Sequence, residues 1–140
     1  MDEKLKVAIL KSAKSMYSSL PVLLGVILLI GLISTIIPRS SYAILFRKNI
    51  LLDSIIGSGL GSILAGNPIT SYVLGGELLK QGVSLVAVTS FMVAWVTVGL
   101  VQLPAESILL GRKFAVSRNL VSFIFSIFVA IITVLIMGLL

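Results

Sequence analysis

The chain has 140 residues, of which 58% are hydrophobic and 11% are charged, and its mean hydropathy is +1.19. A soluble domain carries about twice that charged fraction, so the composition predicts an all-α integral membrane protein. At about 20 apolar residues per crossing, residues 1–140 have room for three or four spans in a single transmembrane domain and no additional soluble domain.

The composition also excludes several kinds of chemistry. Cysteine and histidine are both absent, and the five carboxylates are scattered. Metal sites built on thiolate or imidazole, disulfides, and catalysis by a Cys or Ser–His nucleophile are therefore excluded. No phosphate-binding Gly-Lys-Ser/Thr motif is present, so nothing indicates an ATPase. Without His, Cys or a carboxylate cluster, we expect neither enzyme activity nor a cofactor.

The N-terminal third predicts one span. Residues 2–19 are polar and basic, and predict either an interfacial amphipathic helix or a positive flank that orients the chain. The first span is expected over 20–37, opened by Pro21 and closed by Pro38. After a polar loop, Asn49 is suited to cap a second helix over 50–66.

Small residues line that second helix at four-residue intervals, namely Gly57, Gly61 and Ala65. Such spacing lets another helix approach closely. We expect the chain to form a homodimer through this face.

A helix break follows at Asn67-Pro68, because proline disfavours helical geometry at the preceding residue and suits the first position of a new helix. The new helix is expected over 68–80. Broken helices in a membrane occur where they line a cavity, and transporters place solute sites there.

The remainder predicts two more spans, over 83–103 and 120–140, the second of them mainly lipid-facing. A short segment after Pro104, over 105–111, separates them. Arg112, Lys113 and Arg118 are expected in a basic loop.

Basic residues distinguish two topologies for 50–80. A re-entrant hairpin places seven Lys and Arg residues on the N-terminal side and four on the other, whereas a discontinuous span divides them five against six. The positive-inside rule therefore favours the hairpin with the N-terminus inside, and dual insertion stays open. Because the basic residues lie at span ends, the net charge of +6 does not indicate nucleic-acid binding.

Seven polar or helix-breaking residues are the candidate solute site. Glu77 is an ionisable residue in an apolar segment, although it could simply pair with Lys80. Glu106 lies four residues after Gln102 and could instead pair with Arg112 or Lys113. The full set is Asn67, Pro68, Thr70, Ser71, Glu77, Gln102 and Glu106.

Residues 61–74 (GSILAGNPITSYVL) and 94–119 (AWVTVGLVQLPAESILLGRKFAVSRN) resemble the prokaryotic predicted-permease family that includes the organoarsenical efflux permeases. The resemblance implies a polytopic permease of the plasma membrane. Full-length members are about twice as long, so the chain resembles a half-length version. Arsenical-exporting members carry cysteines near the break and this chain has none, which leaves the substrate open.

The expected function is a half-size secondary permease that acts as a homodimer and moves a small solute or ion across the membrane. The alternative is a non-transporting membrane subunit that packs with a larger partner. The expected partners are the lipid bilayer, a second copy and the solute.

Overall fold

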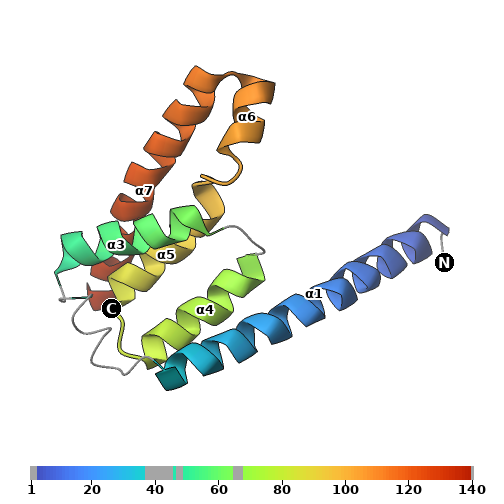
Figure 1. The fold of residues 1–140 in the computed structure, drawn as a ribbon, viewed down its shortest axis with the longest axis horizontal. Helices are drawn as coiled ribbons and strands as arrows, with labels where there is room; N and C mark the ends of the chain where they lie inside the picture. Colours follow the sequence, from blue (N-terminus) through green and yellow to red (C-terminus); the bar gives the residue numbers. More distant parts are fainter. Residues whose placement is uncertain (1–2, 37–45, 47–48, 65–67, 140) are drawn as a thin grey trace. The chain divides into compact units, whose positions relative to one another are not determined.

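The computed structural model describes residues 3–36, 46, 49–64 and 68–139, and all regular structure within them is helical. This confirms the predicted all-α class. The helices are α1 (Glu3–Ile36), α3 (Ile50–Ile63), α4 (Pro68–Lys80), α5 (Leu85–Thr97), α6 (Leu103–Leu110) and α7 (Arg112–Leu139) (Figure 1). The chain divides into two compact units, residues 1–36 and 37–140, and each is described by itself.

The first unit is the single helix α1. α1 begins at Glu3 and continues through Pro21, so the basic segment and the described part of the predicted first span form one helix. Proline removes one backbone hydrogen bond, and the helical residues on both sides keep theirs. The basic segment is therefore helical, and its place at a membrane interface stays a prediction.

The second unit begins with the capped helix α3. Asn49 Oδ1 accepts hydrogen bonds from the backbone N–H groups of Leu51 (3.1 Å) and Leu52 (3.3 Å), which confirms the predicted cap. The helix ends at Ile63, three residues before the predicted end. α4 spans Pro68–Lys80 as predicted.

α3 and α5 run parallel. Ser84, just before α5, donates a hydrogen bond to Asp53 near the start of α3. At the other end, Leu100 N–H, just after α5, donates to Ser62 O in the last turn of α3 (3.3 Å). α4 runs antiparallel to α5, since Gly75 faces Val88 and Met92 while α4 connects to α5 through a tight turn at Gly82. α3 and α4 therefore run in opposite directions, and residues 50 and 80 lie at the same end, as in a hairpin.

The glycine face of α3 is already occupied within the chain. A Cβ atom on Gly57 would overlap Ala87 O and Ser90 Oγ, and a Cβ on Gly61 would overlap Phe91 O. The prediction that the homodimer forms through this face is wrong, because the face packs against α5 of the same chain. Ala65 lies outside the described residues.

The predicted third span is interrupted. α5 ends at Thr97, residues 98–102 form a turn, and α6 follows. The predicted basic loop is also wrong, because Arg112 already begins α7 and the other two basic residues lie inside that helix. Gly111, at φ +89°, makes the sharp turn between α6 and α7. α6 lies beside the first turns of α7 (Figure 1).

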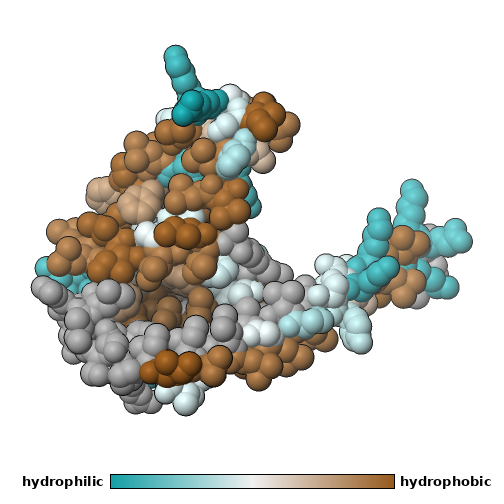
Figure 2. Space-filling model, viewed as in Figure 1, coloured by the Kyte–Doolittle hydropathy of each residue, from teal (hydrophilic) through white to brown (hydrophobic). Residues whose placement is uncertain are grey.

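Among the described residues, Arg112–Gly138 is the one helical segment long and apolar enough to cross a membrane, judged by length and composition. α3 and α5 have 14 and 13 residues, which is about 20 Å of helix against a hydrocarbon core of about 30 Å. Three full spans therefore stay a prediction. Figure 2 shows apolar side chains over much of the visible surface of α6 and α7, with hydrophilic ones gathered at the turn between them.

Candidate solute-binding site

The turn between α5 and α6 is held by groups from distant segments. Gly99 N–H, freed where α5 ends, donates to Asn119 Oδ1 of α7 at 2.8 Å. The next amide, on Leu100, donates to Ser62 O at the end of α3. Both groups lose their helical hydrogen-bond partners where α5 ends, and these contacts replace them. The break is therefore stabilised by contacts from α3 and α7.

A polar network fixes α6 against α7 beside this break. Arg118 binds Glu106 in a bidentate ion pair, with Nη2–Oε1 at 2.6 Å and Nε–Oε2 at 3.1 Å. Asn119 Nδ2 donates to Glu106 Oε2 (3.2 Å) and Ala115 O (2.9 Å). The Arg118 and Glu106 side chains are only 35% and 19% exposed, so the pair is partly shielded from solvent. A bidentate pair of this kind fixes geometry as well as charge.

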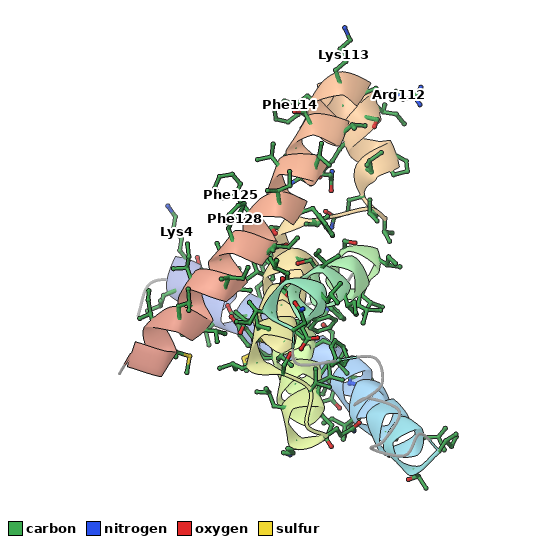
Figure 3. The ribbon with its side chains drawn as sticks, turned by 90° about the vertical axis from the view of Figure 1, so that its left-hand side faces the viewer. Lys4, Arg112, Lys113, Phe114, Phe125 and Phe128 are labelled. Atoms are coloured by element: carbon green, nitrogen blue, oxygen red, sulfur yellow. The ribbon has the colours of Figure 1, made fainter. Side chains whose placement is uncertain are left out.

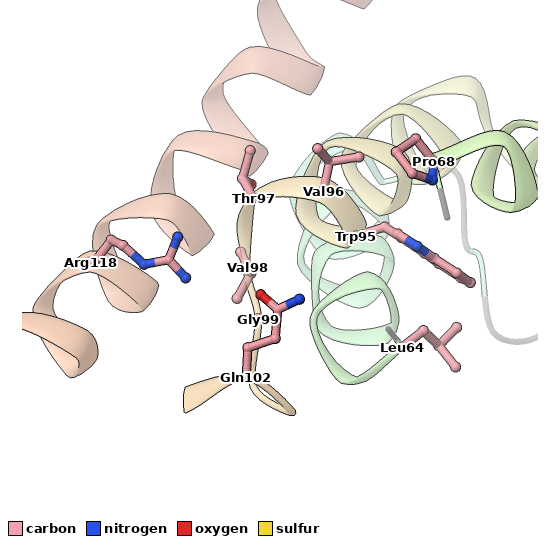
Figure 4. A pocket seen from close by; sticks show the side chains of 9 residues that line it. All are labelled: Leu64, Pro68, Trp95, Val96, Thr97, Val98, Gly99, Gln102 and Arg118. Carbon is pink, nitrogen blue, oxygen red and sulfur yellow. The ribbon is translucent and has the colours of Figure 1, made fainter. Parts of the chain in front are cut away.

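The two helix breaks meet at one cavity of about 110 Å³ (Figure 4). Pro68 brings the start of α4 to this cavity, and Leu64 brings the residue that follows α3. The last turn of α5 and the α5–α6 break supply most of the remaining wall, and Arg118 reaches it from α7. The lining residues are Leu64, Pro68, Trp95, Val96, Thr97, Val98, Gly99, Gln102 and Arg118.

This cavity offers a polar solute more than one kind of contact. Gln102 supplies an amide that both donates and accepts, and Arg118 supplies a guanidinium whose charge Glu106 balances. The C-terminal end of α5 also lines the cavity, and the last carbonyl groups of a helix carry partial negative charge. The volume exceeds that needed for a single water. Such a site suits a small polar solute without requiring a net charge.

Two of the predicted site residues, Pro68 and Gln102, line this cavity, and Glu106 lies one contact away through Arg118. Glu106 does not pair with Arg112 or Lys113, because the helical start of α7 places Arg118 beside it instead. Asn67 lies outside the described residues.

Thr70 and Ser71 are buried in the first turn of α4. Ser71 Oγ donates to Pro68 O at 2.7 Å, a bond within the helix. Ser71 also lines a separate, mostly apolar groove of about 330 Å³ between α4 and α5. The structure therefore places these two hydroxyl residues beside the cavity wall and not in it.

Glu77 is separated from the other candidates. It pairs with Lys80 one turn away (3.3 Å), and the lysine side chain is 76% exposed. Glu77 lies nine residues from Pro68 along α4, which is about 14 Å of helix. The structure thus shows the Lys80 pairing that the sequence offered as the alternative.

Sequence reasoning missed three polar residues: Arg118, Asn119 and Asp53. Arg118 and Asn119 carry no local signal, because their partners lie 12 to 20 residues away. Asp53 did carry one, since it precedes Gly57 and Gly61 at the same four-residue spacing and so belongs to the close-packed face of α3.

No family model, curated protein or solved structure matches the chain. The resemblance to the permease family therefore stays a prediction, and the functional argument depends on the geometry of the chain itself.

Proposed function

We propose that the chain is a half-size secondary permease of a cell membrane, with its solute site in the cavity where the two helix breaks meet. The observation that carries the proposal is this convergence. Pro68 and Gln102, from two separate breaks in apolar sequence, face one cavity together with Arg118. Membrane proteins tolerate broken helices at a cavity, and transporters bind solutes at such positions.

The exposed surface supports membrane residence. Figure 3 shows Phe125 and Phe128 standing out from α7, and they are 63% and 59% exposed. On α6, Ile108 and Leu109 are more than four-fifths exposed, at 84% and 81%. Contact of this apolar surface with water is unfavourable, whereas contact with lipid tails is not.

A homodimer is part of the proposal, although not through the glycine face. The predicted resemblance to permeases about twice this long favours an assembly of two copies. Chemical cross-linking of the wild-type chain in liposomes should yield a dimer. A chain that requires a second, larger protein for stability would favour the alternative, a non-transporting subunit.

The test is solute flux in liposomes that contain the purified chain. The probes are inorganic phosphate, arsenite, a small carboxylic acid, a neutral amino acid and a quaternary amine. Gln102→Leu removes the cavity amide, and Glu106→Gln weakens the hold on Arg118. Both should lower flux of the transported probe at least several-fold, while Glu3→Gln, an exposed position on α1, should leave it unchanged. Wild-type flux in both cavity variants would contradict the assignment of the site.

A further inference from the structure

A second polar group is buried at the opposite end of α3 and α5 from the cavity. Asp53 is 0% exposed, in the first turn of α3. Its Oδ2 accepts a hydrogen bond from Ser84 Oγ, while its Oδ1 has no hydrogen-bond partner. Burying a carboxylate oxygen with no hydrogen-bond partner costs free energy, so its presence in a fold calls for a functional explanation. An ionisable residue in such a place is a functional site by default in a membrane protein.

No described cation balances this carboxylate. Asp53 is the only charged residue of α3, and α5 has none. The charged residues of α7 are Arg112, Lys113 and Arg118, in the turns that adjoin α6, and from residue 119 onwards α7 has none. On α4, Glu77 and Lys80 pair with each other.

The surroundings suit a proton better than a metal ion. A metal such as Ca²⁺ needs about six oxygen ligands, whereas a proton needs one. The described residues hold no group of three His, Cys, Asp or Glu. The neighbouring hydroxyl of Ser54 is committed to Leu51 O at 2.9 Å. Ser84 is half-buried, so this described partner of the Asp53 side chain also links it to the surface.

We infer that Asp53 is the proton-coupling group of the proposed permease. Uptake of a proton on the carboxylate gives a neutral acid that fits the buried position, and its release restores the charge. No other bond is made or broken. The inference rests on the proposed function for its role in transport, but the binding of a proton at Asp53 is testable alone.

The packing connects this group to the cavity. Asp53 lies on the face of α3 that carries Gly57 and Gly61 in backbone contact with α5. The far end of the same face reaches the cavity break through the Leu100 to Ser62 hydrogen bond. With no space between the two helices, a shift of one at Asp53 moves the other.

The first test needs no solute. The sequence contains two aspartates, Asp2 and Asp53. Labelling with aspartate that carries ¹³C at its carboxyl carbon, in an Asp2→Asn chain in lipid, therefore leaves one labelled side chain for NMR. We expect its signal to move between the ionised and the neutral position as the pH is changed. A signal fixed at either position, or one that responds to sodium chloride at constant pH, would overturn the inference.

The second test uses the probe that moves in the flux assay. Asp53→Asn keeps the size of the side chain and one acceptor oxygen for Ser84. It should retain exchange of the probe at zero gradient and lose accumulation driven by a proton gradient. The matched control is Glu77→Gln, which should keep both. If Asp53 titrates but no probe moves, the proposed function fails and the proton site stands. If a proton gradient drives accumulation of the probe equally in Asp53→Asn and in the wild-type chain, the coupling role fails and the proposed permease function stands.

Discussion

At the scale of single residues, the closest packing occurs where side chains are absent. Gly57 and Gly61 place the backbone of α3 against that of α5, and neither position has room for a Cβ. Gly59 lies between them on the same helix, and a Cβ there would meet nothing within 4 Å. This contrast separates the role of glycine in packing from its low helix propensity.

We therefore expect Gly61→Ala to destabilise the fold by about 1–3 kcal/mol, because the added methyl group overpacks the contact. Gly59→Ala should stabilise it by about 0.5–1 kcal/mol through better helix propensity. Thermal or SDS-induced unfolding followed by circular dichroism measures both. Equal effects of the two substitutions would contradict the close α3–α5 contact.

The two described ion pairs should differ in strength. Glu106 is partly buried and makes three hydrogen bonds, two to Arg118 and one to Asn119. Glu77 makes one, to a lysine that is largely exposed. We expect Glu106→Gln to lower stability by about 1.5–3 kcal/mol and Glu77→Gln by at most about 0.5 kcal/mol. The same unfolding assay compares them, and a larger loss in Glu77→Gln would refute the assignment of the structural network to Glu106.

At the scale of elements, the main departure from the predicted helices is the division of the third predicted span. α3 and α4 each pack on α5 and run in opposite directions, and α5 and α6 divide what the sequence predicts as one span. The division between α5 and α6 has a tertiary reason. The freed amides of residues 99 and 100 bind groups supplied by α7 and α3, so the chain leaves the helix without losing hydrogen bonds.

The hairpin leads to a prediction about sidedness. Single cysteines at position 50 and at position 80 should react with an impermeant thiol reagent from the same side of the membrane, because α3 and α4 run in opposite directions. The chain has no native cysteine to interfere. Intact and permeabilised vesicles distinguish the sides. Reaction from opposite sides would support a discontinuous span instead.

At the scale of the whole molecule, the distribution of exposed apolar side chains along α7 gives a way to test whether this helix crosses a membrane. Phe114 and Phe125 are both exposed on α7, at 54% and 63%. Phe114 lies near the basic end of the helix, beside Arg112 and Lys113, whereas Phe125 lies near its middle (Figure 3). If α7 crosses the bilayer, these two positions sit at very different depths.

We expect Phe125→Lys to impair membrane insertion, because lysine at the centre of a span costs about 2.5–3.5 kcal/mol. Phe114→Lys should be tolerated, since its amine reaches the headgroup region. The measurement is the fraction of chain retained in alkali-washed membranes. Equal retention of both variants would count against α7 as a transmembrane helix.

Local chemistry determined a large part of the fold. Asn49 caps α3, and Pro68 begins α4, because a cap and a helix-starting proline act within one turn of the chain. The all-α class follows from the composition. Of the predicted site, the sequence located Pro68 and Gln102 at the cavity, since helix breaks and polar residues in apolar sequence are visible locally.

Tertiary structure decided the rest, because the deciding partners are far apart in sequence. The end of α5 depends on Asn119, twenty residues after Gly99. The burial of Asp53 depends on Ser84, thirty-one residues away. The same local pattern of glycines fits a contact with a second copy or with the same chain, and only the parallel packing of α3 on α5 distinguishes the two.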